Sequence, residues 1–83
     1  MPIVLQVKSL LEDTLGLGAR INTLNMDSAL LGSIPELDSM TVLSILTGLE
    51  ERFGFTIEDD EFSGEIFETL GSLVAFVEAK LGR

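Results

Sequence analysis

Apolar residues recur at the spacing of one helical face in three separate segments of the chain, and a glycine follows each segment. The first segment covers about residues 3–15, the second about residues 39–53, and the third begins after Thr69 and ends before Gly82. Residues at positions i, i+3, i+4 and i+7 share one face of an α-helix, and glycine accepts the left-handed backbone that often closes a helix. The pattern therefore predicts an all-α fold in which three long amphipathic helices pack their apolar faces together.

The stretch between the first two predicted helices, residues 17–38, has no sustained period and is rich in turn-forming residues. A connection longer than about 12–15 residues is uncommon in a compact domain unless it is functional or contains a short helical turn. Residues 28–31 are the candidate for such a turn. The apolar residues of this long loop indicate that it lies on the core, and they are Ile21, Leu24, Met26, Leu30, Leu31, Ile34 and Leu37.

Four consecutive acidic residues, 58–61, precede Phe62 and predict a short third helix, because carboxylates stabilise the N-terminus of a helix. Gly64 limits its length. The alternating run 53–57 is too short to form a sheet without a partner run. We therefore expect residues 1–83 to form a single domain, a four-helix bundle with three long helices, a short third helix and a long first loop.

The chain contains neither cysteine nor histidine, which excludes disulfides, thiolate or imidazole metal sites, and Ser-His or Cys-His nucleophile pairs. A chain of 83 residues also has little room for a deep catalytic cleft. The net charge of −9 argues against binding to nucleic acid or to an anionic membrane, since both require basic surfaces. No apolar run reaches the ~18 residues of a membrane-spanning helix and the start lacks a signal peptide, so we expect a cytoplasmic protein.

Negative charge is concentrated in one part of the sequence. Residues 27–68 contain eleven acidic residues and a single basic one, Arg52. The spacing of the acids around residues 58–68 does not match an EF-hand loop, so no metal site is predicted there. The local excess of carboxylates predicts that partners are basic.

Residues 37–40, Leu-Asp-Ser-Met, lie at the start of the second predicted helix. A phosphate on Ser39 would lie near unpaired backbone N–H groups and the positive end of the helix dipole. Asp38 could contact the Mg²⁺ that a phosphate-transferring enzyme brings with its nucleotide substrate. The plainer alternative is that both residues only cap the helix. Residues 27–28 carry the same Asp-Ser dipeptide without a long helix after it.

Taken together, these features resemble an acyl carrier protein over nearly the whole chain. Such proteins show Asp-Ser-Leu or Asp-Ser-Met where residues 38–40 read Asp-Ser-Met, and residues 49–54 read Leu-Glu-Glu-Arg-Phe-Gly at the end of the second helix. The helix lengths, the long first loop, the acidic third helix and the low pI of about 4.1 are also similar to that family. The chain is thus identified as a member of the phosphopantetheine-binding carrier family.

The resemblance implies a carrier rather than an enzyme, with no catalytic residue of its own. Ser39 matches the position to which a phosphopantetheinyl transferase attaches 4′-phosphopantetheine from coenzyme A, with Asp38 and Met40 completing the motif. The thiol of that group holds an acyl group as a thioester. Because the chain has no cysteine, no protein thiol could remove the acyl group by exchange.

The resemblance also implies that the second helix meets basic patches on partner enzymes, such as an acyl- or aminoacyl-loading ligase or an acyltransferase. Asp38, Glu50 and Glu51 match acidic positions of that helix. Thr41, Ser44 and Thr47 depart from carriers of fatty acid synthesis, which usually have acids at the first two positions and often Met at the third. Acidic residues follow instead at Glu58, Asp59, Asp60, Glu61, Glu65 and Glu68. They either place the partner surface around the third helix or, in the plainer interpretation, form only a solvated face. We expect a monomer that binds neither nucleic acid nor membrane.

Residues 30–40 look like stand-alone carriers of lipopolysaccharide or exopolysaccharide and lipid biosynthesis, which favours a specialised pathway over housekeeping fatty acid synthesis. An aminoacyl or D-alanyl carrier is the alternative within carriers, because its motif also tends to read Asp-Ser-Met. An acidic helical interaction module without a prosthetic group is the alternative from another class. Phe62, Ile66 and Phe67 could line an acyl pocket, but core packing is the favoured interpretation.

Overall fold

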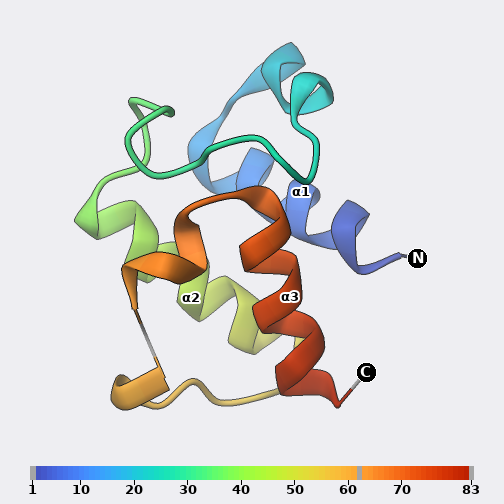
Figure 1. The fold of residues 1–83 in the computed structure, drawn as a ribbon, viewed down its shortest axis with the longest axis vertical. Coiled ribbons are helices and arrows are strands. Elements are labelled where there is room, and N and C mark those ends of the chain that lie inside the picture. Colours follow the sequence, from blue (N-terminus) through green and yellow to red (C-terminus); the bar gives the residue numbers. More distant parts are fainter. Residues whose placement is uncertain (1, 62, 83) are drawn as a thin grey trace.

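The computed structural model describes residues 2–61 and 63–82, apart from the side chain of Asp59. Within these residues the three long helices are α1 (Ile3–Leu15), α2 (Ser39–Phe53) and α3 (Leu70–Leu81). Figure 1 shows them packed side by side, with the long first loop across one end of the bundle. Each helix ends at a glycine in the left-handed conformation, Gly16, Gly54 and Gly82. The predicted all-α fold and the bounds of the three helices are confirmed.

The core consists of the apolar faces of the three helices. Their fully or almost fully buried side chains recur at the predicted helical spacing. They are Val7, Leu10, Leu11 and Leu15 of α1, Val42, Ile45, Leu46 and Leu49 of α2, and Leu70, Leu73, Val74 and Val77 of α3.

The long loop has its helical turn in a different place from the one predicted. The turn is a 3₁₀ helix, η1 (Gly18–Thr23), whereas residues 28–31 are not helical and Ala29 forms an isolated antiparallel bridge with Thr69. The prediction for residues 28–31 was wrong because their backbone groups bond to a distant segment instead of to one another.

Four backbone hydrogen bonds join residues 26–31 to residues 67–71, and we call this set the loop clamp. Leu30 N–H donates to the Glu68 carbonyl at 3.0 Å and Leu31 N–H to the Phe67 carbonyl at 2.9 Å. In the other direction, Leu70 N–H donates to the Ser28 carbonyl at 3.0 Å and Gly71 N–H to the Met26 carbonyl at 2.8 Å. The last two bonds satisfy donors in the first turn of α3, which has no intrahelical acceptors for them.

Only some of the apolar residues of the loop are buried as predicted. Leu30, Ile34 and Leu37 are buried in the core, and Ile21 and Leu24 pack against it in part. Two residues expected on the core are exposed instead: Met26 at 46% and Leu31 at 47%.

The short third helix is two 3₁₀ turns, η2 (Asp59–Glu61) and η3 (Gly64–Phe67). The acidic turn therefore forms as expected, and Gly64 begins a second turn after it. Ile66 and Phe67 are buried members of the core, as favoured from the sequence. Phe62, the third residue considered for an acyl pocket, lies outside the described residues.

Polar contacts hold the connection between α2 and η2 against the bundle. The Glu50 Oε2 atom accepts a hydrogen bond from Ile57 N–H at 2.7 Å. Lys80 of α3 donates to both carboxylate oxygens of Glu61 at 2.8 Å, and its Nζ lies 5.8 Å from the centre of the Phe55 ring. The cation thus interacts with both a carboxylate and an aromatic face.

Replacing Gly71 by alanine tests the loop clamp. Alanine normally favours a helix by about 1 kcal/mol over glycine, but a Cβ at Gly71 would lie 2.7 Å from the Met26 carbonyl oxygen, which is backbone and cannot move away alone. We expect Gly71→Ala to lower the free energy of unfolding by about 1–3 kcal/mol, as overpacking does. Urea unfolding followed by circular dichroism measures this.

Gly48→Ala is the matched control, because its Cβ would meet the end of the Leu10 side chain, at 2.5 Å, which can change rotamer. We expect its effect to be the smaller of the two, since the gain in helix propensity offsets part of the cost. A Gly71→Ala variant as stable as the original chain would contradict the close approach of Met26 to α3.

Candidate functional site

Asp38 caps the N-terminus of α2. Its Oδ1 atom accepts hydrogen bonds from Met40 N–H and Thr41 N–H, both at 3.0 Å. In return Thr41 Oγ1 accepts the Asp38 N–H at 2.7 Å, which completes a capping box. Two donors that have no intrahelical partner are therefore satisfied by one carboxylate oxygen.

The same contacts lower the pKa of Asp38 below its ordinary value. The largest cause is the hydrogen bond from the Thr41 backbone, and the Thr41 hydroxyl and the Met40 backbone add to it against the cost of desolvation. These donors favour the charged form of the carboxyl group. Asp38 is therefore an anion at neutral pH and acts as the cap of α2 in that form.

Ser39, the first residue of α2, is exposed and takes no part in the capping box. Its hydroxyl makes no hydrogen bond to any residue that the structure describes. The alternative interpretation from the sequence, in which Asp38 and Ser39 both cap the helix, is therefore correct for Asp38 alone. The Ser39 hydroxyl is free to react without any loss of a structural hydrogen bond.

The expectation that first-turn N–H groups await a phosphate needs a correction. Met40 N–H and Thr41 N–H already bond to Asp38, and of these first three residues of α2 only Ser39 has a backbone N–H without a partner among the described residues. The helix dipole still favours an anion at this end of α2. The Asp38 carboxylate, however, places a negative charge beside a phosphate attached to Ser39.

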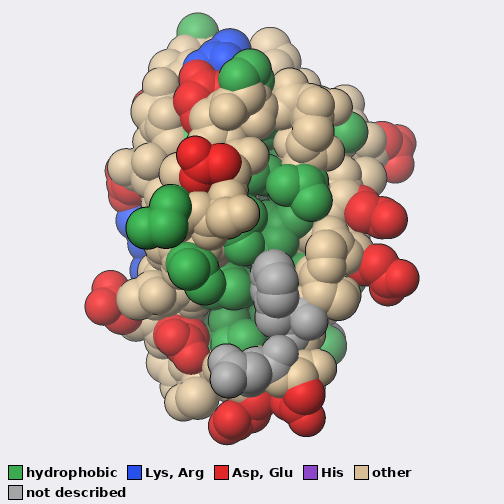
Figure 2. All heavy atoms as spheres, turned by 90° about the vertical axis from the view of Figure 1, so that its left-hand side faces the viewer, with side chains coloured by type: hydrophobic (Ala, Val, Ile, Leu, Met, Phe, Trp, Pro, Cys, Tyr) green, Lys and Arg blue, Asp and Glu red, His purple; other side chains and the backbone are tan. Residues whose placement is uncertain are grey.

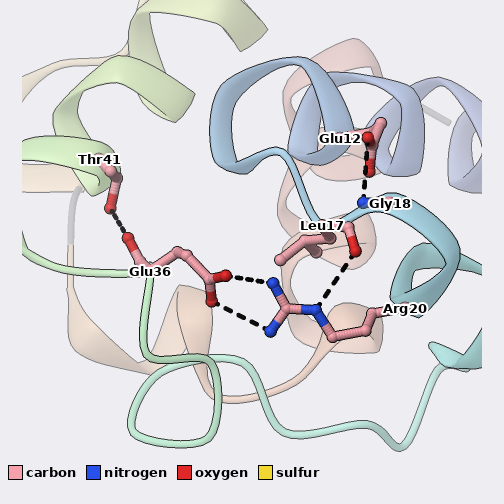
Figure 3. A network of polar contacts seen from close by, with 6 residues as sticks. All are labelled: Glu12, Leu17, Gly18, Arg20, Glu36 and Thr41. Atoms are coloured by element: carbon pink, nitrogen blue, oxygen red, sulfur yellow. Dashed lines mark hydrogen bonds and ion pairs between the residues drawn. The ribbon is translucent and has the colours of Figure 1, made fainter.

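An ion pair holds the loop that leads into the site. The Arg20 guanidinium of η1 makes a two-pronged contact with the Glu36 carboxylate, Nη1 to Oε1 at 3.3 Å and Nη2 to Oε2 (Figure 3). Arg20 Nε also donates to the Leu17 carbonyl at 3.2 Å. The contact with Arg20 is the main cause that lowers the pKa of Glu36. The Glu36 carbonyl in turn lies 3.1 Å from the Thr41 hydroxyl and shares its proton with the Asp38 carbonyl at 3.0 Å.

Two large apolar side chains of α2 point away from the core near Ser39. Met40 is 72% exposed and Leu43 is 59% exposed, the highest values among the exposed large hydrophobic residues. They border a shallow hollow of ≈ 400 Å³ between α1 and α2, together with Ser44, Thr47, Gly48 and Glu51 of α2 and Leu10 and Thr14 of α1. Figure 2 shows hydrophobic side chains gathered on the side where α2 begins, with carboxylates around them.

The residues expected to bind partners differ in their surroundings. Ser44, Thr47, Glu51 and Asp60 are exposed. Thr41 is half-buried because its hydroxyl belongs to the cap of α2. Glu50 and Glu61 are half-buried, the first bonded to Ile57 and the second to Lys80. The side chain of Asp59 lies outside the described part of the structure.

Two features of the site escaped the sequence interpretation. Leu43 could have been found, because it lies off the apolar stripe of Val42, Ile45, Leu46 and Leu49 and so must face away from the core. The pairing of Arg20 with Glu36 could not be recognised in the sequence, because 16 positions separate the two residues and no helix contains both.

A family model described as "phosphopantetheine attachment site" matches residues 5–77, most of the chain. The chain belongs to this family. Among solved structures, the solution NMR structure of a holo acyl carrier protein from Nitrosomonas europaea is 53% identical to it, with a TM-score of 0.91 and 100% of both chains covered. An acyl carrier protein from Exiguobacterium sp. is 41% identical over 44 residues. This match spans about half the length of that curated relative, and 53% of the present chain.

These comparisons confirm the resemblance to acyl carrier proteins, a group of carriers rather than enzymes, and the expectation of a 4′-phosphopantetheine prosthetic group. In the part of the chain that the structure describes, no cluster of three or more His, Cys, Asp or Glu side chains could hold a metal ion. None of the described helices is long and apolar enough to cross a membrane.

The division of roles between Asp38 and Ser39 can be tested by stability alone. At pH 7 we expect Asp38→Ala to lower the Tm by several degrees, because the carrier loses the cap of α2. Ser39→Ala should stay within about 2–4 °C of the original chain, as exposed substitutions do. Thermal unfolding followed by circular dichroism measures both.

The effect of Asp38 should depend on pH in a defined direction. A carboxyl group whose pKa is lowered in the folded state stabilises the fold above its unfolded pKa of about 3.9. This contribution is lost as the pH falls through the lowered folded value. The difference in Tm between the original chain and Asp38→Ala should therefore narrow in acid, and a gap that widens would contradict the cap described here.

Proposed function

We propose that this chain is an acyl carrier protein that holds acyl groups as thioesters on a 4′-phosphopantetheine arm attached to Ser39. The observation that supports it most is the state of Ser39 in α2, an exposed hydroxyl without a hydrogen bond to any described residue, directly after the residue that caps the helix. The family match and the similarity to a holo acyl carrier protein support the same function. Residues 1–83 would act as a single carrier domain.

The residues of the motif would have separate roles. Ser39 supplies the attachment oxygen. Asp38 uses Oδ1 for the helix cap, and Oδ2 accepts no hydrogen bond from a described residue, so it is available to the Mg²⁺ that a transferase brings. The arm, when attached, supplies the thiol that carries the acyl group. No residue of the chain needs to carry out a chemical step on the cargo.

We propose a specialised pathway, such as lipopolysaccharide or exopolysaccharide and lipid biosynthesis, rather than housekeeping fatty acid synthesis. The support is the neutral character of α2 at Thr41, Ser44 and Thr47, where carriers of fatty acid synthesis usually carry acids or Met. The first eleven residues of α2, 39–49, contain no charged residue at all.

The partners would be a phosphopantetheinyl transferase and a loading ligase or acyltransferase. Any enzyme that acts on a group at Ser39 must cover the start of α2, where Met40 and Leu43 are the large exposed apolar side chains. We propose that these two residues make the close contact, with Ser44, Thr47 and Glu51 around them. A basic patch on the partner would be attracted by Glu51 and by the acidic turn with Asp59, Asp60 and Glu61.

Intact mass spectrometry tests the attachment residue. The original chain, Ser39→Ala and Ser28→Ala are each incubated with coenzyme A, Mg²⁺ and a broad-specificity phosphopantetheinyl transferase. We expect the mass of one phosphopantetheine to be added to the original chain and to Ser28→Ala, and no addition to Ser39→Ala.

Ser28 is the matched control because it follows Asp27 as Ser39 follows Asp38. Its side chain accepts a hydrogen bond from Asn25 N–H at 2.9 Å, and no long helix begins there. Absence of loading on the original chain, under conditions that load a control carrier protein, would favour the acidic interaction module. Incubation of the loaded chain with an acyl-transferring or an amino-acid-activating ligase would then separate acyl from aminoacyl carriers.

The contact through α2 predicts a change in affinity with little change in rate. Leu43→Gln keeps helix propensity and removes the apolar surface, so the KM of the transferase for the carrier should rise about tenfold while kcat changes little. Leu5→Gln is the control, since Leu5 is 48% exposed on α1, outside the proposed contact. Equal KM values for the two variants would argue against docking at Leu43.

A further inference from the structure

Arg20 is the one described link, by hydrogen bond or ion pair, between the two arms of the long loop, residues 17–24 and 28–38. Both nitrogens at the end of the guanidinium contact the Glu36 carboxylate, so the two planar groups form a fork. A fork of this kind fixes orientation as well as distance, which a lysine cannot do. Figure 3 shows Arg20 reaching across the loop to Glu36.

The space between the two arms is incompletely filled. A hollow of ≈ 310 Å³ is lined by Leu17, Arg20, Thr23, Leu24, Ser28, Ala29, Ser33 and Ile34. Leu17 and Ile34, one from each arm, are nevertheless buried in the core, so the fork adds a polar link to apolar packing that already holds both arms.

Glu36 connects this link to the start of α2. Its carbonyl lies 3.1 Å from Thr41 Oγ1, as one of three acceptors that share the single Thr41 hydroxyl proton with the Asp38 carbonyl at 3.0 Å and Asp38 Oδ1 at 3.3 Å. The same oxygen of Thr41 accepts the Asp38 N–H at 2.7 Å. Ser39 lies between Asp38 and Thr41 in the capping box. Arg20 thus acts on the backbone at Ser39 through Glu36 and Thr41, without contact with Ser39 itself.

The segment before Glu36 is held at its other end by the loop clamp, through Leu30 and Leu31. Between the clamp and Glu36 the described hydrogen bonds are local, from Ser33 and Ile34 to the Leu30 carbonyl and from Leu37 to the Ile34 carbonyl. The side chain of Glu36 is therefore the point at which this segment is tied to the first arm of the loop.

We propose that Arg20 and Glu36 are positioning residues for modification at Ser39, because their fork holds the turn that leads into α2. This inference rests on the proposed function, in which Ser39 accepts the phosphopantetheine arm. The fork fixes the approach of residues 36–38 to the helix, and so keeps Ser39 in the orientation that the transferase meets.

The first test does not depend on loading. Hydrogen exchange of backbone amides, measured by NMR, is compared between the original chain, Arg20→Gln and Glu36→Gln. We expect the Met40 and Thr41 amides to exchange about threefold to fivefold faster in both variants, the range that loss of a well-oriented surface pair allows. Amides of α3 should keep their rates, whereas a merely structural loss of stability would accelerate all of them.

The second test measures loading by the transferase at a temperature well below the Tm. We expect kcat/KM to fall about threefold to fivefold in Arg20→Gln and in Glu36→Gln, and no further in the double variant, because both substitutions remove the same interaction. Arg20→Lys should give an intermediate value, since it restores the charge without the fork.

Arg52→Gln is the matched control. Arg52 also pairs with a carboxylate, Asp13, and contacts Ser9 at 3.3 Å, but it lies at the opposite end of α2 from Ser39. We expect this variant to load at the original rate. Unchanged exchange and loading in the Arg20 and Glu36 variants would overturn the proposal, and so would equal effects in Arg52→Gln.

The outcomes also separate this inference from the proposed function. Faster exchange at Met40 and Thr41 in a chain that no transferase loads would leave the Arg20–Glu36 fork as a structural link, but it would overturn the role of the fork in modification together with the proposed function. Normal loading of the original chain with unchanged values in every Arg20 and Glu36 variant would overturn the positioning role alone.

Discussion

The backbone pairing between residues 26–31 and 67–71 is the constraint on which the rest of the arrangement depends. A long loop laid over an apolar core must find partners for its N–H and C=O groups, because burying them unpaired is costly. The loop clamp supplies those partners and at the same time satisfies donors at the start of α3. It brings Met26 so close to α3 that a residue with a side chain at position 71 would collide with the Met26 carbonyl. One set of bonds thus places the loop, the start of α3 and, further along the chain, the entry to α2.

At that entry, structural and chemical tasks fall to different residues. Asp38 and Thr41 close the capping box, and Glu36 is tied to Arg20, so the backbone around position 39 is held from both sides. Ser39 contributes nothing to these contacts. If Ser39 carries the proposed arm, its place outside the hydrogen bonds that hold the fold means that modification would remove none of them. The neighbours of Ser39 provide stability so that Ser39 does not have to.

The three long helices could be predicted from the sequence, because apolar stripes are local signals and a glycine marks the C-terminal end of each of α1, α2 and α3. A motif of neighbouring residues also predicts the attachment residue, Ser39, and that role stays a prediction. The loop could not be predicted in the same way. Residues 28–31 have the composition of a helical turn, but their partners lie about forty positions away, and nothing local announces such a pairing. The link between Arg20 and Glu36 was missed for the same reason.

The isolation of Ser39 from the structural hydrogen bonds makes position 39 a suitable chemical handle. The chain contains no cysteine, so Ser39→Cys would introduce a single thiol into a scaffold that has no other. A thiol at the N-terminus of a helix has a lowered pKa and reacts readily, although the charge of Asp38 beside it opposes this effect. Dyes, spin labels or crosslinkers could be attached there in place of the proposed arm. A crosslinker on this single sulfur atom could then capture the partner enzymes that bind near position 39, while the rest of the surface stays unchanged.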